Sequence, residues 1–441
     1  MQDPTHLHRI VMVALLLREK FLLLALLSTV LAYAFEHTLL AHGEVTALVV
    51  SGLLIGAILC ASIRVAHHAE LLAEKVGDPY GTMILTLSAV LVEVIILAIM
   101  MQHSESPTLV RDTIYSAVML DINGILGLAA LMGGLKHGEQ AYNDDSSRTY
   151  SVMILTAMGI SMVVPEFIPE ARWELYSGFT IVVMLILYSL FLRMQTGPHS
   201  YFFSYSYPEK RKRRGTVGAS PAASTAAGSA AAGSSASTSS APTSTAPTST
   251  APTSASTASP TDKVAATASA AAPQDLAADG APVVAHEAEP TNIKESIGVL
   301  IFGVIVIGAL AEVMSKTLQL GLSSTGAPPI VTALLVATIS AGPEILTALR
   351  AALANRMQSV VNIALGASLS TVILTVPVME AMALYTGQPF QMAMTPVQTV
   401  MVAITLIVAA INLNDGQTNA IEGMTHFVLF ATFLMLSVMG L

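Results

Sequence analysis

Long apolar runs follow one another along most of the chain, separated by short polar stretches. A helix needs about 20 mostly apolar residues to cross a bilayer, and about 11 runs approach that length. They cover residues 10–34, 45–66, 81–102, 114–135, 150–168, 175–194, 296–320, 329–350, 358–383, 396–412 and 424–441. We therefore predict an all-α polytopic membrane protein with about 11 transmembrane helices, the first of them retained as an anchor.

Residues 215–290 break this pattern with a stretch of Ala, Ser, Thr and Pro in which APTST recurs. Such a stretch buries too little apolar surface to offset its ordering entropy, so we expect a disordered linker. A basic run, Lys210–Arg214, precedes it. The predicted organisation is an N-terminal anchor helix (1–40), a first five-helix repeat (45–205), the basic run with the linker (206–291) and a second five-helix repeat (292–441).

Positive charge in short loops marks the cytoplasmic side of a membrane protein. With the basic run inside, the predicted helices give a cytoplasmic N-terminus, a cytoplasmic linker and an external C-terminus. Of the 20 Lys and Arg residues, only Arg111, Arg172 and Lys316 then fall outside. Apart from the anchor helix, five predicted helices lie on each side of the linker. Because five is an odd number, the two halves must enter the membrane in opposite orientations. This is the inverted-repeat plan of many secondary transporters, which bind their substrates near the bilayer midplane.

Composition supports the membrane assignment, because the chain is 53% hydrophobic and 11% charged, with a mean hydropathy of +0.67. Soluble domains carry roughly 25% charged residues. The sequence contains no phosphate loop, dinucleotide fingerprint or zinc signature, so we expect no enzyme, no cofactor and no nucleic-acid partner. The single cysteine, Cys60, excludes an intramolecular disulfide. The expected partners are transported cations, protons and the lipid bilayer.

Two glutamates lie deep inside predicted spans of the two halves. A charged side chain at the bilayer centre costs at least about 2.5–3.5 kcal/mol on insertion scales, so it is retained mainly where it functions. Glu93 stands between Val92 and Val94, and Glu344 has the matching place in the second half, directly after Gly342-Pro343. Proline removes a backbone donor and clashes one turn back, so we expect a kink and freed carbonyl ligands there. Glu93 and Glu344 are the predicted cation and proton site.

Five further candidate ligands lie at comparable depth in the predicted spans: Asp121, Asn123, Ser340, Asn362 and Ser368. Asp121 is the only carboxyl among them. Asn123, Asn362 and Ser368 could equally form hydrogen bonds between helices. Glu70 and Glu312 make a third acidic pair, which is either a proton pathway or an interfacial charge without a role in transport.

Three segments resemble a known transporter family. Residues 342–368, from GPEILT to NIALGAS, are similar to the second alpha repeat of the calcium/cation antiporter superfamily. Residues 133–143 resemble the end of its first repeat, and NDGQTNAIEG at 414–423 resembles the loop before its last helix. The resemblance covers 45–205 and 292–441 and is nearest to the ChaA-type calcium/sodium:proton antiporters of the cation/proton exchanger branch. It implies a bacterial inner-membrane antiporter that exchanges Ca²⁺, Na⁺ or K⁺ for protons.

The chain departs from the family pattern beside both glutamates. Calcium-selective members carry Gly-Asn ahead of each repeat glutamate, whereas residues 89–93 read AVLVE and residues 340–344 read SAGPE. Ca²⁺ takes 6–8 oxygen ligands. Without these amides the site offers fewer ligands, which suits Na⁺ or K⁺ as well, so strict calcium selectivity is not expected.

We expect cations and protons to compete for the same carboxyls. Burial disfavours the ionised form, so Glu93 and Glu344 should hold protons until a cation displaces them, and each occupied state should favour a different facing of the site. The alternative is a passive cation channel lined by the same acids.

Overall fold

The computed structural model of the protein describes residues 19–76, 80–104, 106–196, 293–323, 325–388 and 390–441. The predicted linker, the basic run and the first predicted helix before Glu19 lie outside these residues. The helices before the linker are α2 (Lys20–Ala41), α3 (Glu44–Val76), α4 (Tyr80–His103), α5 (Leu109–Met119), α6 (Leu126–His137), α7 (Asp144–Met158) and α8 (Trp173–Thr196). The helices after it are α10 (Ile293–Leu322), α11 (Pro329–Ser340), α12 (Gly342–Leu353), α13 (Met357–Ser370), α14 (Val376–Thr386), α15 (Pro396–Asn412) and α16 (Ala420–Met439).

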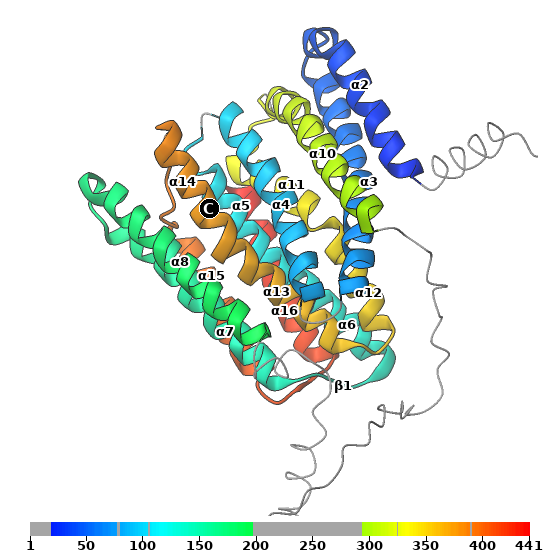
Figure 1. Cartoon of the computed structure of the whole chain (residues 1–441). Coiled ribbons are helices and arrows are strands. Elements are labelled where there is room, and N and C mark those ends of the chain that lie inside the picture. Colours follow the sequence, from blue (N-terminus) through cyan, green and yellow to red (C-terminus); the bar gives the residue numbers. More distant parts are fainter. Residues whose placement is uncertain (1–18, 77–79, 105, 197–292, 324, 389) are drawn as a thin grey trace, which may run out of the picture. The chain divides into compact units, whose positions relative to one another are not determined.

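The all-α polytopic architecture is confirmed (Figure 1). Within the described residues, nine helical stretches are long and apolar enough to cross a membrane, and the bent pair α11–α12 makes a tenth. α15 has only 17 residues, so the predicted count of eleven spans is not confirmed. The first described helix runs to Ala41 rather than ending at 34. α3 continues to Val76, beyond the predicted end at 66, because the polar residues of its last turns find partners inside the protein.

Four of the described spans depart from regular α-helix, and in the span that begins with α7 a π-helical turn, η2 (Gly159–Val163), follows the helix. α11 and α12 meet at Ala341 with a 58° bend, at the position where Gly342-Pro343 predicts a kink. A π-helical turn, η1 (Leu120–Ile125), joins α5 to α6, and another, η6 (Thr371–Thr375), joins α13 to α14. π-Helical turns occur frequently at functional sites. The last two spans are counterparts in the predicted repeats, which themselves stay a prediction.

The polar loops gather at two ends of the helix bundle. At one end, which we call the strand face, β1 (Gln140–Ala141) pairs antiparallel with β2 (Gln417–Thr418), a small addition to the all-α expectation. There Lys136 Nζ donates to the Leu353 carbonyl at 2.9 Å. At the other end, which we call the opposite face, Gln391 N donates to the Pro107 carbonyl at 2.9 Å. The loops predicted to share the cytoplasmic side thus lie together at the strand face, at the lower end of the bundle in Figure 1.

α2 packs along α3 and α10 and is tied to them near both of its ends. Near the opposite face, Lys316 Nζ of α10 bridges Glu36 of α2 at 2.9 Å and Glu312 at 3.0 Å. At the other end, Glu19 pairs with Arg64. Burial raises the pKa of Glu19, but hydrogen bonds from Arg64 and His68 outweigh burial and hold this pKa below its usual value.

α6 and α16 approach each other closely because glycines face the contact. A Cβ atom added at Gly134 would collide with the backbone of Ala420, and one added at Gly423 would collide with the backbone of Leu131. Small residues of this kind allow the backbones of membrane helices to pack against each other. This contact supports the span that carries η1.

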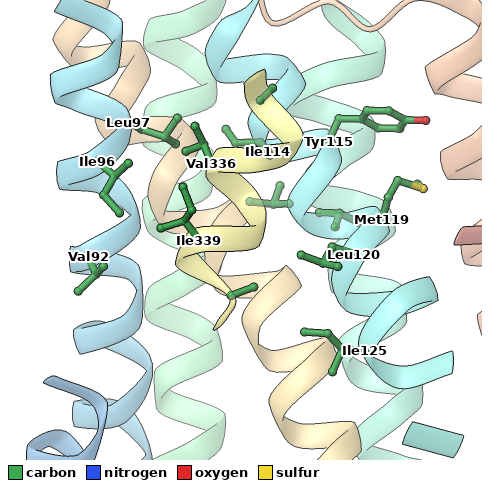
Figure 2. Close-up of a cluster of buried hydrophobic side chains, with 14 of the residues drawn as sticks. Val92, Ile96, Leu97, Ile114, Tyr115, Met119, Leu120, Ile125, Val336 and Ile339 are labelled. Carbon is green, nitrogen blue, oxygen red and sulfur yellow. The ribbon is translucent and has the colours of Figure 1, made fainter. Parts of the chain in front are cut away.

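An apolar layer, formed by Ile96, Leu97, Ile114, Val336 and Ile339, fills the space between α4, α5 and α11 (Figure 2). None of these side chains is more than 2% exposed. α4 runs from Tyr80 toward the opposite face, so the layer lies on the opposite-face side of Glu93. It therefore separates the middle of the bundle from the opposite face.

Candidate functional site

A cavity of about 190 Å³ lies inside the bundle, between α3, α4, η1, the α11–α12 bend and the span of α13 and η6. Four acidic side chains line it: Glu70, Glu93, Asp121 and Glu344. Hydroxyl and amide side chains from four spans share the wall with apolar residues, so the cavity offers oxygen ligands to water and to charged species.

Glu93 is held firmly in its place on α4. Its side chain is 6% exposed. Oε2 accepts a hydrogen bond from Thr371 Oγ1 at 2.8 Å and a longer one from Thr375 Oγ1 at 3.4 Å. Oε1 is buried and has no hydrogen-bond partner among the described residues. Since a buried acceptor without a partner is costly, Oε1 is the atom on which a proton or a cation would be most stabilising.

Asp121 reaches the same cavity from the π-helical turn η1. It is 2% exposed, and its Oδ2 accepts a hydrogen bond from Ser368 Oγ at 3.1 Å. Ser368 does not itself line the cavity, so it acts on the site by orienting the Asp121 carboxyl.

Glu344 is placed by the break in its span. It occupies the first turn of α12, where the unpaired N–H groups of a helix favour negative charge. Unlike Glu93, it is partly exposed, and no described side chain donates a hydrogen bond to it. Ser340, one turn earlier, also lines the cavity. The Ser340 hydroxyl donates to the Ala337 carbonyl at 3.0 Å, which leaves its oxygen lone pairs available to a cation.

The cavity extends from these acids toward the strand face. Ser51 Oγ, near the start of α3, donates to Thr317 near the opposite-face end of α10, so the other end of α3 points to the strand face. Glu70 and Asn362 line the cavity as well. The Asn362 side-chain oxygen accepts a hydrogen bond from Gln358 Nε2 at 2.9 Å. The buried apolar layer lies in the other direction.

Two of the predicted site residues lie elsewhere. Asn123 faces α15 and α16, where its Nδ2 donates to Thr405 Oγ1 at 2.7 Å and its Oδ1 lies 3.0 Å from His426 Nδ1. On the π-helical turn, Asn123 points away from the cavity that Asp121 lines. It forms hydrogen bonds between helices, which is one of the two roles that the sequence left open. Glu312 accepts hydrogen bonds from Tyr33 and Lys316 near the opposite face, and it does not line the cavity.

Sequence reasoning overlooked the hydroxyls that hold Glu93. Thr371 and Thr375 are four residues apart on one helix face, in the run TVILT. That spacing was a usable signal, because i and i+4 residues of a helix share a face. Thr86 and Ser88, which resemble packing residues in the sequence, also line the cavity.

The acids do not form a ready metal cluster. Within the part of the chain that the structure describes, no three His, Cys, Asp or Glu side chains lie close enough to hold one metal ion together. Hydroxyl and amide oxygens of the same wall are further candidate ligands for a cation in this cavity.

Comparison with known proteins identifies the family. The family model described as sodium/calcium exchanger protein matches residues 45–197 and 295–439. The chain belongs to this family. The resemblance to the calcium/cation antiporter superfamily is thereby confirmed, and the protein is an integral membrane transporter.

Two of the relatives are named as cation/proton antiporters. The sodium-potassium/proton antiporter ChaA of Escherichia coli is 28% identical over 341 residues, which cover 76% of this chain and 74% of that protein. A Ca²⁺/H⁺ antiporter of Aphanothece halophytica is 21% identical over 312 residues, 69% of this chain and 67% of that protein. A crystal structure of the Ca²⁺/H⁺ antiporter YfkE has the same fold, with a TM-score of 0.61, 14% identity and coverage of 95% of this chain and 99% of that one.

Proposed function

We propose that this protein exchanges a cation for protons across the bacterial plasma membrane, and that both ions compete for Glu93 and Glu344, with Asp121 beside them. The observation that carries the proposal is the cavity in which these three carboxyls meet inside a membrane-spanning bundle. Carboxylates in such an interior are costly unless they are neutralised. Each must therefore hold a proton or contribute to binding a cation, which is the condition for coupled exchange.

Glu93 offers one oxygen to the exchanged ion. Thr371 and Thr375 donate to Oε2 whether the carboxyl is charged or not, so the exchange takes place at Oε1. In the proton-loaded state Oε1 carries the proton. In the cation-loaded state the proton leaves through the cavity, and Oε1 becomes a ligand. Glu344 and the Ser340 hydroxyl supply oxygens from the other half of the chain.

The ligand set favours a monovalent cation over a strict preference for Ca²⁺. Ca²⁺ takes 6–8 oxygens, and in the described residues no three His, Cys, Asp or Glu side chains lie close enough to hold one metal ion together. ChaA is named for sodium and potassium, which supports the same choice. We expect Na⁺ or K⁺ to be transported, with Ca²⁺ accepted where water completes its shell.

The described conformation gives access from the strand face. The cavity reaches Glu70 on the side of that face, and the buried apolar layer lies between Glu93 and the opposite face. Under the topology expected from the Lys and Arg distribution, the strand face is cytoplasmic, the N-terminus is inside and the C-terminus is outside. Cations would then load from the cytoplasm and leave after the layer opens and the strand side closes.

The test is charge neutralisation in everted vesicles that carry an imposed proton gradient. We expect Glu93→Gln and Glu344→Gln to abolish cation-induced proton efflux, because neither amide can bind an exchangeable proton. Glu174→Gln, an exposed residue outside the cavity, serves as the matched control and should behave like the wild type. Exchange retained by both variants of the cavity would contradict the proposal.

The same vesicles separate antiport from the rival function, a passive cation channel. Added cation should drive proton efflux when the membrane potential is clamped at zero with valinomycin and balanced K⁺. A channel would give cation flux under these conditions without proton movement. A channel is also less consistent with a cavity that the apolar layer closes at one end.

A further inference from the structure

A second, larger cavity opens at the opposite face, away from the exchange site. Its volume is about 520 Å³, and it lies between α8, α14 and the segment that precedes α15. The short turns η3 (Val164–Phe167) and η4 (Glu170–Arg172) form its rim. This volume falls within the roughly 300–1,000 Å³ typical of small-molecule sites. It is much larger than a single dehydrated metal ion requires.

A buried carboxyl lines the inner part of this cavity. Glu380 of α14 is 2% exposed, and its Oε2 has no hydrogen-bond partner among the described residues. Ser177 of α8 lies beside the carboxyl. An acceptor that lacks a donor in the protein is a site for a donor from a ligand, because leaving it unpaired costs free energy.

The charge of the cavity is negative. Glu166 and Glu170 line it at the rim, where both are exposed, and its described lining contains no Lys or Arg. The nearby guanidinium of Arg111 is already paired with Asp112. It donates to the Ala393 carbonyl at 2.8 Å and so does not neutralise Glu380.

Aromatic side chains make up much of the remaining wall. Trp173, Tyr176 and Phe390 all line the cavity. The Tyr176 hydroxyl donates to the Ile160 carbonyl at 2.7 Å, which fixes the residue and leaves its ring as the surface offered to a ligand. Aromatic faces attract cations, most strongly where the cation is desolvated. A carboxylate surrounded by such rings is an arrangement that suits an organic ammonium group.

We propose that this cavity binds an organic cation with N–H-bearing ammonium groups, such as an alkyl diamine or polyamine. One ammonium group donates to Glu380 Oε2 beside Trp173 and Tyr176, and a second group pairs with the rim glutamates. A metal ion fits less well, because the described residues hold no cluster of three acidic or histidine ligands. A quaternary ammonium also fits less well, because it has no N–H to donate to Oε2.

The chain provides its own reporter of binding. Trp173 is the single tryptophan of the protein, so intrinsic tryptophan fluorescence reports on this cavity alone. The purified full-length protein in detergent is titrated with butane-1,4-diamine at constant ionic strength. We expect a saturable change in emission, and a Kd at least about tenfold weaker for the bis-trimethylammonium analogue of the same chain length, since a hydrogen bond to a charged group is lost.

Two variants locate the site. Glu380→Gln should weaken diamine binding at least about tenfold, whereas Glu174→Gln, next to the tryptophan but outside the cavity, should bind like the wild type. If Glu380→Gln does not elute as a folded protein, Tyr176→Leu replaces it and should also weaken binding. A wild type without a saturable change, equal affinity for the two analogues, or unchanged binding in the cavity variant would each overturn the proposal. The measurement needs no transport, so its outcome is independent of the exchange function.

Discussion

α4 and the α11–α12 pair each bring one glutamate to the same cavity, and they do so in opposite ways. α4 is a continuous helix of 24 residues, and Glu93 is held in it by two threonines from another span. The second span is broken by 58°, and Glu344 stands at the start of its second half without a side-chain hydrogen bond. Glu93 is 6% exposed, whereas Glu344 is open to the cavity.

The difference separates two ways of stabilising a carboxylate inside a membrane. The Glu93 carboxylate is stabilised by neighbouring side chains, so hydrogen bonds from Thr371 and Thr375 fix its position. Glu344 depends on the backbone, because the N-terminus of α12 favours a negative charge without fixing the side chain. We infer that Glu93 sets the geometry of the site and that Glu344 adapts to the ion that is bound.

Shortening each glutamate by one methylene should show the largest contrast. Glu93→Asp withdraws the carboxyl by about 1.5 Å and breaks both threonine contacts. The loss of one strong and one weak hydrogen bond, together with the displacement of Oε1 from the bound ion, should cost about 3 kcal/mol, or roughly a hundredfold in cation kcat/KM. Glu344→Asp should cost only about tenfold or less, because it breaks no side-chain hydrogen bond and keeps its charge near the helix terminus.

Cation-dependent proton flux in proteoliposomes measures both variants, with protein amount and monodispersity matched. Equal losses for Glu93→Asp and Glu344→Asp would remove the distinction between the fixed and the adaptable carboxyl.

Replacing Thr371 should weaken cation binding more than replacing Thr375, because Thr371 donates the shorter hydrogen bond to Glu93. Thr371→Val removes the 2.8 Å hydrogen bond, and we expect a roughly tenfold higher KM for the cation. Thr375→Val removes a contact of 3.4 Å, which is weak by geometry, so about a twofold change is expected. Thr347→Val is the control, because Thr347 lines the cavity but its hydroxyl bonds only to the Pro343 carbonyl. A wild-type KM in Thr371→Val would show that Glu93 does not need this anchor.

Much of this contrast could be predicted from the sequence. The long apolar runs predicted the spans. The cost of a charge at the bilayer midplane indicated Glu93, Glu344 and Asp121 as functional residues, and Gly342-Pro343 predicted the break. Each of these rests on a local rule that one stretch of sequence satisfies by itself. The ligand role of these residues stays a prediction, although the structure places all three at one cavity.

The features that could not be predicted from the sequence arise from contacts between helices. The π-helical turns η1 and η6 have no strong local signal, yet η1 separates Asp121, which faces the cavity, from Asn123, which faces α15. The partnership of Thr371 with Glu93 joins residues 278 positions apart. The lengths of α2 and α3 were also wrong at their ends, because tertiary partners extend a helix past the end of its apolar run.

A smaller effect than that of Thr371→Val should come from the break itself. Pro343→Ala restores an N–H and removes the ring that clashes with the Ile339 carbonyl, so the span should straighten in part and Glu344 should move away from Glu93. Because Gly342 and the packing around Ala341 maintain some of the bend, we expect about a threefold higher KM rather than loss of exchange. Pro396→Ala, at the first turn of α15 and away from the cavity, is the matched control and should leave KM unchanged. A loss in Pro343→Ala as large as that in Glu93→Asp would mean that the backbone break, rather than the fixed carboxyl, sets the geometry of the site.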